Sequence, residues 1–140
     1  MRSSRLWSVF LFPAGVLGCS LALYHSVLPY HMGWRHGLGD APDSIVWALF
    51  ALNFSWSVLV FLSGCLVIYA GKLGPGAGAY ARRTVFTVGL FWAIHGAYTW
   101  LNPLPLPSSL VWLRYVLGLF PAAVVVLHWL PLALHRRRPA

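Results

Sequence analysis

Four apolar stretches of this 140-residue sequence each contain a polar side chain that is costly to place in a membrane: His25, Asn53, His95 and Arg114. Neutral imidazole is a common ligand of haem iron, copper and zinc, because one ring nitrogen carries an available lone pair. His25 and His95 stand in different stretches, so they are candidates to hold one cofactor from opposite sides. Haem b or a transition metal fits this ligand pair, and the sequence does not identify which.

Arg114 and Asn53 suit a different ligand, an anion or a lipid headgroup. A guanidinium stays charged and donates two parallel hydrogen bonds to a carboxylate or a phosphate. Counting about 1.5 Å per helical residue from the nearer end of each stretch puts all four polar groups roughly 8–12 Å below one membrane boundary. The sequence therefore predicts a single polar layer in the outer half of the membrane. His128 lies toward the opposite end of its stretch and is set apart from this layer.

The loop predicted above this layer, residues 31–44, adds further polar groups. His31 and His36 are five residues apart and are candidate ligands for a metal at the membrane surface. Asp40 and Asp43 make the loop acidic and are the only side-chain carboxylates of the chain. No H-x-x-x-H or C-x-x-C-H pattern occurs, so the histidine spacing alone does not establish a metal or haem site.

A structural interpretation competes with both ligand hypotheses. Histidine and asparagine inside membranes often hydrogen-bond across helices, for about 0.6 kcal/mol on average. Arg114 would then extend to nearby headgroups or pair with a loop aspartate. Catalysis has little support, because the chain has no glutamate, its two aspartates share one loop, and no G-x-S-x-G motif is present. We predict no catalytic residue.

The composition requires a lipid environment around the molecule. The sequence is 59% hydrophobic and 9% charged, whereas a soluble domain carries about 25% charged residues. The net charge of +8 would suggest nucleic acid in a soluble protein, but here the basic residues cluster at the ends of apolar stretches, where they set orientation and attract anionic lipids. The expected partners are the bilayer and another membrane protein or a second copy of the chain, and not nucleic acid.

The elements that position these residues are four transmembrane helices. The apolar stretches predict helices at about 6–30, 45–71, 84–101 and 109–134, and ~20 residues span a bilayer. Basic residues precede the first helix, separate the second from the third and follow the fourth. We therefore expect an all-α, up-down-up-down bundle, a single domain over residues 1–140, in the cell membrane with both termini cytoplasmic.

Cys19 leaves one alternative for the first helix. Residues 16–19 resemble the lipobox of bacterial lipoproteins, in which the cysteine is lipidated after signal cleavage. Leu17 fits that motif poorly, and the apolar stretch continues to Tyr30 instead of giving way to polar sequence, which favours an uncleaved helix. Because no C-x-x-C occurs, we interpret Cys19 and Cys65 as small packing residues.

Small residues spaced four apart predict the faces on which the helices pack, because close backbone approach favours association in lipid. The patterns are Ala14, Gly18 and Ala22; Gly89, Ala93 and Ala97; and Gly118 with Ala122. Tryptophans near helix ends predict rings buried in the membrane with the indole N–H in water. They are Trp7, Trp34, Trp47, Trp100 and Trp129.

This organisation is similar in kind to small four-helix membrane subunits, including b-type cytochrome anchors in which histidines on different helices hold haem. The resemblance concerns architecture alone, and no motif carries it, so it implies no role for any residue. We expect an accessory or interaction subunit whose polar outer-side site binds metal, haem or lipid. The alternative is a membrane enzyme or electron-transfer protein that uses histidine-ligated metal or haem b.

Overall fold

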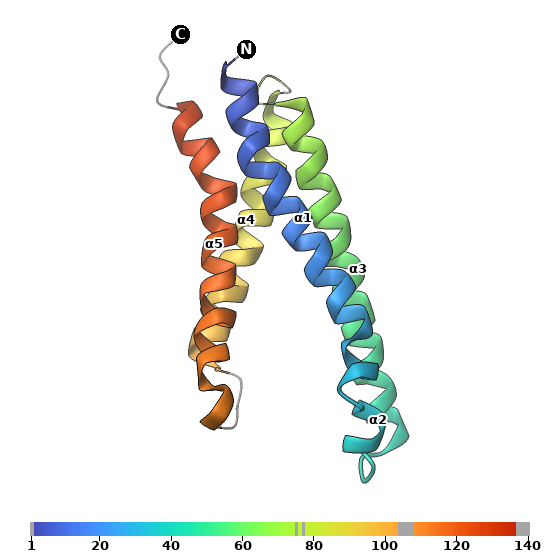
Figure 1. The fold of residues 1–140 in the computed structure, drawn as a ribbon. Helices are drawn as coiled ribbons and strands as arrows, with labels where there is room; N and C mark the ends of the chain where they lie inside the picture. Colours follow the sequence, from blue (N-terminus) through green and yellow to red (C-terminus); the bar gives the residue numbers. More distant parts are fainter. Residues whose placement is uncertain (1, 75, 77, 104–107, 137–140) are drawn as a thin grey trace. The chain divides into compact units, whose positions relative to one another are not determined.

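All four apolar stretches are α-helical in the computed structural model, which describes residues 2–74, 76, 78–103 and 108–136. The long helices are α1 (Arg2–His31), α3 (Asp43–Leu73), α4 (Gly78–Leu101) and α5 (Val111–Arg136), as Figure 1 shows. Two short helices accompany them, α2 (Trp34–Gly37) and the 3-10 helix η2 (Ser108–Leu110). No strand occurs in these described segments, so the all-α prediction is confirmed for them.

Three of the helices are long and apolar enough to cross a membrane. Their candidate spans are Arg5–His31, Asp43–Leu73 and Ser108–His135. The remaining helix, α4, has 24 residues, but arginines near its start and His95 in its second half make it less apolar. The structure therefore supports association with a membrane through three spans, while the crossing by α4 stays a prediction.

Two predicted loops are shorter than expected. α4 begins at Gly78, whereas the apolar stretch predicted a start at Thr84. Arginine is a good helix former, so the helix continues past the end of the apolar stretch through Arg82 and Arg83. The predicted loop 31–44 contains α2, which follows Gly33, whose φ of 60° is in the left-handed region that glycine adopts without strain.

The chain packs as two compact units. Unit 1 comprises Met1–Ala14 and Val67–Ala140, and unit 2 comprises Gly15–Leu66. Helices α1 and α3 each contribute one segment to unit 1 and one to unit 2. α2 belongs to unit 2, whereas α4 and α5 belong to unit 1.

In unit 2, the backbones of α1 and α3 approach each other closely at Gly64. A Cβ at this position would lie 2.7 Å from the Gly15 carbonyl oxygen and 2.7 Å from the Cys19 sulfur. From the other helix, a Cβ on Gly18 would meet the Cα of Gly64 at 3.6 Å. Gly18 and Ala22 are both buried, so the packing face predicted for the first helix is confirmed here.

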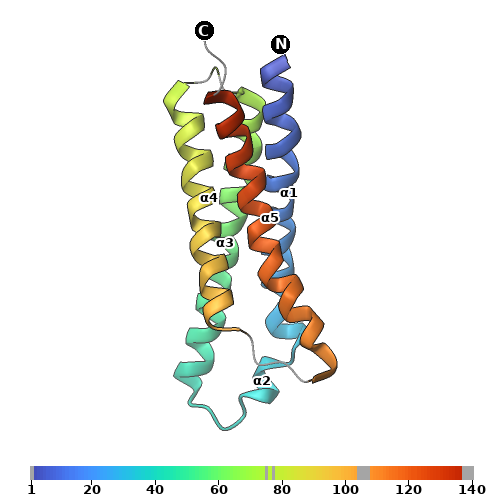
Figure 2. The same ribbon diagram turned by 90° about the vertical axis from the view of Figure 1, so that its left-hand side faces the viewer.

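In unit 1, α4 and α5 run side by side and antiparallel, as Figures 1 and 2 show. Gly89 faces the indole of Trp129, and a Cβ on Gly96 would lie 3.0 Å from Pro121. Ala97, which the small-residue pattern placed on this face, is exposed. That part of the prediction is wrong because the large partners on α5 require glycine opposite them, and the two glycines are seven residues apart.

Three of the predicted interfacial tryptophans donate to the backbone of another helix. The donor and acceptor pairs are Trp7 with Ala70 (3.2 Å), Trp100 with Gly118 (3.2 Å) and Trp129 with Phe86 (3.4 Å). Trp7 is only 1% exposed, so its N–H does not reach water. For these three side chains the prediction of a water-facing indole is wrong, since a carbonyl oxygen on the packed helix serves as the acceptor.

Candidate functional site

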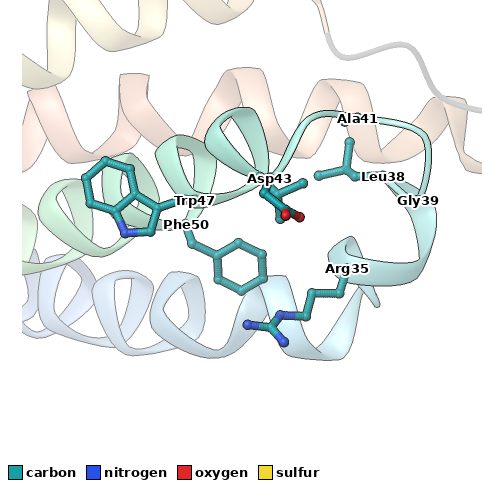
Figure 3. Close-up of a pocket in the computed structure, with 8 residues that line it drawn as sticks. Arg35, Leu38, Gly39, Ala41, Asp43, Trp47 and Phe50 are labelled. Carbon is teal, nitrogen blue, oxygen red and sulfur yellow. The ribbon is translucent and has the colours of Figure 1, made fainter.

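A pocket opens in unit 2 between α2 and the beginning of α3. Its volume is about 460 Å³. The lining side chains that matter chemically are Arg35 from α2 and Asp43, Trp47 and Phe50 from α3. Figure 3 shows Arg35 and Asp43 on different walls, with the Phe50 ring between them in this view. A cation and an anion thus border one space that has an aromatic wall.

Aromatic contacts hold this wall in place. The Phe50 ring centroid lies 5.8 Å from that of Tyr30 and 5.9 Å from that of Trp34, with interplanar angles of 75° and 82°. Such edge-to-face pairs contribute about 0.5–1.5 kcal/mol each beyond the burial of the rings. Because Tyr30 is near the end of α1 and Trp34 begins α2, one ring on α3 fixes both elements beside the pocket.

The charges of the pocket suit a ligand that carries both signs. Asp43 is the first residue of α3, where the helix dipole favours a carboxylate. Arg35 offers a planar fork for a phosphate, and the Phe50 ring offers a face to an ammonium group. Of the two aspartates predicted to form an acidic loop, Asp43 lines this pocket, whereas Asp40 is not among its lining residues.

His25 and Asn53 meet in unit 2. The Asn53 amide nitrogen donates to the His25 carbonyl oxygen at 2.6 Å. The imidazole itself packs on Trp56, with ring centroids 4.4 Å apart and an interplanar angle of 60°. The amide therefore links α3 to the backbone of α1, which agrees with a structural role for Asn53.

His95 lies in unit 1 among aromatic rings of its own helix. Its imidazole stacks on Phe91 with centroids 6.3 Å apart and 10° between the planes, and it meets Trp92 edge-on at 5.7 Å. The side chain is half-buried. Because His25 belongs to unit 2, the structure describes the two candidate ligands separately, and a cofactor held by both stays a prediction.

Arg114 does not share a layer with His95. Gly96 on α4 packs on Pro121 of α5. Because the two helices are antiparallel, residues before Pro121 lie opposite residues after Gly96. This register puts Arg114 level with Pro103, just past the end of α4 and about 12 Å along the helix direction from His95. Arg114 is exposed on α5. Binding of an anion by Arg114 stays a prediction.

His31 and His36, the two candidate ligands at the membrane surface, are not part of a cluster of metal-binding side chains in the described segments. His31 at the end of α1 and His36 in α2 are both exposed. Within the described segments, no three residues among histidine, cysteine, aspartate and glutamate are grouped so that they could hold a metal ion. No protein-family model, curated protein or solved structure matches this chain.

One buried histidine was left out of the predicted polar layer. His128 is 1% exposed, and its Nδ1 lies 2.7 Å from the Val124 carbonyl oxygen. Its Nε2 is buried and has no hydrogen-bond partner in the part of the chain that the structure describes. If Nδ1 donates to that carbonyl, Nε2 presents a lone pair to the interior of unit 1. The sequence shows a histidine within an apolar stretch, but its burial depends on the facing helix.

Proposed function

We propose that this chain is a four-span integral membrane protein with both termini cytoplasmic, and that it serves as a small accessory subunit that binds a zwitterionic phospholipid headgroup. The observation that carries this proposal is the pocket of about 460 Å³ in unit 2, which Arg35 and Asp43 border together. Phosphatidylethanolamine has the matching groups, a phosphate and an ammonium.

The fourth crossing is supported by the length of α4 and by its neighbour. A helix of 24 residues is about 36 Å long, and the hydrocarbon core of a bilayer is about 30 Å thick. Residues 84–101 contain no lysine, arginine, aspartate or glutamate. α4 also packs along α5, which is itself long and apolar enough to span.

Contacts at one end of unit 1 support an even number of crossings. Trp7 near the start of α1 lies edge-on to His135 near the end of α5, with ring centroids 6.2 Å apart. Trp7 also bonds to Ala70 near the end of α3. The first and last helices thus meet at the end where Arg82 and Arg83 begin α4. Arginines near helix ends favour the cytoplasmic side, which agrees with cytoplasmic termini.

In this topology the pocket of unit 2 opens among the headgroups of the outer leaflet. Arg35 would donate its parallel N–H groups to the phosphate, and Asp43 would attract the ammonium. The Phe50 face adds a cation–π contact of about 0.5–1 kcal/mol at an exposed site. A ligand that carries both a phosphate and an ammonium neutralises the charges of Arg35 and Asp43 together. A simple anion would neutralise only the charge of Arg35.

The topology is tested by labelling single cysteines in intact cells with a membrane-impermeant maleimide. Cys19 and Cys65 are first replaced by alanine, and then Asp40→Cys, Gly76→Cys and Ser108→Cys are made one at a time. Four spans predict labelling at 40 and 108 and none at 76 until the cells are lysed. If α4 does not cross, position 108 stays on the cytoplasmic side, and protection of that cysteine in intact cells would refute the four-span proposal.

Lipid binding is tested in nanodiscs by the amount of phosphatidylethanolamine that stays on the purified protein. An exposed charge pair contributes up to about 1 kcal/mol, so Arg35→Gln and Asp43→Asn should each weaken binding about threefold to fivefold. Soluble phosphoethanolamine is the second ligand, and equal affinity for it would assign the pocket to a free metabolite. Asp40→Asn and Arg114→Gln are matched controls. If Arg114→Gln lost binding and Arg35→Gln retained it, the proposal that the lipid binds in the pocket at Arg35 would be refuted.

A further inference from the structure

A second pocket lies in unit 1, between the first turns of α4 and the end of α5. Its volume is about 680 Å³. Its polar lining residues are Arg82, Arg83, Thr87 and His135, and its large apolar ones are Phe86 and Leu132. The pocket therefore presents cationic donors beside an apolar surface. This arrangement complements a phospholipid at the point where its phosphate joins its acyl chains.

The arginines of this pocket lack an acidic side chain of their own unit. Asp40 and Asp43 are the only two acidic side chains of the chain, and both belong to unit 2. Arg82 and Arg83 are exposed, so their guanidinium groups are accessible to an external anion. A guanidinium is planar and donates in parallel, which matches the oxygens of a phosphate better than those of a simple halide ion.

Ring contacts fix the apolar side of the pocket. Trp129 stacks on Phe86 with centroids 5.8 Å apart and 15° between the planes, and it donates to the Phe86 carbonyl oxygen at 3.4 Å. On α5, His135 is held edge-on against Trp7 at 6.2 Å. A wall that is already formed lowers the entropy lost when a ligand binds.

We propose that this second pocket binds the phosphate of an anionic phospholipid in the cytoplasmic leaflet. This rests on the four-span topology proposed above, which puts Arg82 and Arg83 among cytoplasmic headgroups. The guanidinium groups hold the phosphate oxygens, and the Thr87 hydroxyl is a further donor. Phe86 covers the glycerol and the first methylene groups, which a free phosphate lacks. Phosphatidylglycerol is the simplest lipid with this chemistry, and a basic pocket between helices is a known solution for such headgroups.

The test uses the full chain in nanodiscs that contain equal phosphatidylglycerol and phosphatidylethanolamine, with the lipids retained after purification measured by mass spectrometry. The key variant combines Arg82→Lys with Arg83→Lys, because lysine keeps both positive charges and thus the orientation signal, but loses the planar fork. We expect about tenfold weaker retention of phosphatidylglycerol, equal to ~1.4 kcal/mol. Lys72→Gln, which removes an exposed charge that does not line the pocket, should have a smaller effect.

Two results would overturn the proposal. Unchanged retention in the double lysine variant, with a loss in Lys72→Gln, would show that anionic lipid is attracted by diffuse charge alone. Displacement of the lipid by an equal concentration of inorganic phosphate would show that Phe86 contributes nothing and that the site does not select a lipid. Phosphatidylethanolamine retained in the same sample reports the pocket at Arg35, and labelling of Ser108→Cys reports the topology, so failure of either earlier proposal is seen separately.

Discussion

Gly64→Ala should separate α1 from α3 in unit 2. The new Cβ would lie 2.7 Å from the Gly15 carbonyl oxygen and 3.0 Å from the Cys19 backbone nitrogen. Ordinary contacts of a Cβ begin at 3.4 Å, so the two backbones must move apart by 3.4 − 2.7 = 0.7 Å. A backbone cannot rotate away as a side chain can, because each helix is held by its own hydrogen bonds.

The magnitude of this effect follows from two opposing contributions. Overpacking of a tight interface costs about 1–3 kcal/mol. Replacing glycine by alanine inside a helix stabilises the helix by about 0.8–1.0 kcal/mol. The free energy of unfolding of Gly64→Ala should therefore fall by roughly 0–2 kcal/mol, although the substitution improves helix propensity.

A series of glycine substitutions isolates the steric contribution. A Cβ on Gly37 meets nothing within 4 Å, and one on Gly71 comes closest to the Leu11 Cβ, at 3.2 Å. Relative to Gly37→Ala, we expect Gly64→Ala to be about 1–3 kcal/mol less stable, with Gly71→Ala between them. The assay is unfolding in mixed detergent micelles, followed by circular dichroism.

The rate at which the two cysteines are oxidised reports the separation of α1 and α3 near Gly64. The Cys19 and Cys65 sulfurs are 4.0 Å apart and both thiols are free. Their oxidation to a disulfide by an added oxidant should slow in Gly64→Ala, because the alanine methyl displaces Cys19. The reasoning would be refuted if Gly64→Ala were as stable as Gly37→Ala and its thiols were oxidised at the wild-type rate.

Three further predictions concern polar groups within the long helices. Trp100→Phe removes the N–H bond to Gly118 and should lower the free energy of unfolding by about 0.5–1.5 kcal/mol, whereas an unchanged value would mean that the bond adds nothing. His128→Leu removes an unsatisfied buried nitrogen, whose burial costs about 1–3 kcal/mol, so the thermal midpoint should rise; a fall would show that Nε2 has a partner. The two-histidine haem hypothesis predicts a Soret band that His25→Ala and His95→Ala each abolish. A wild-type protein with neither that band nor bound copper, zinc or iron would eliminate it.

Local features of the sequence predicted most of the helices. An unbroken apolar stretch demands a helix in lipid, because no water is present to satisfy the backbone. The starts of helices were less predictable, since α4 extends through Arg82 and Arg83 to Gly78, beyond the apolar stretch. His25 and Asn53, which the sequence places at similar depth, are joined by a hydrogen bond, whereas the register of α4 and α5 does not set Arg114 beside His95. Depth counted from a helix end cannot give the register between two helices.

What the sequence determined by itself is the class of this protein: an all-helical, strongly apolar chain whose few charges mark the ends of its helices. Only the tertiary structure decided which residues border the same pocket. It set Arg35 across one pocket from Asp43, and it set Arg82 and His135 around another. Of these residues, the sequence by itself singles out only Asp43 as a candidate. Arg82 and His135 are far apart along the chain and come together because α4 packs along α5, where Gly89 and Gly96 face large side chains. Arg35 and Asp43 are near each other in the sequence, but their position across a pocket depends on how α2 folds against the start of α3. A pattern of single residues encodes neither arrangement.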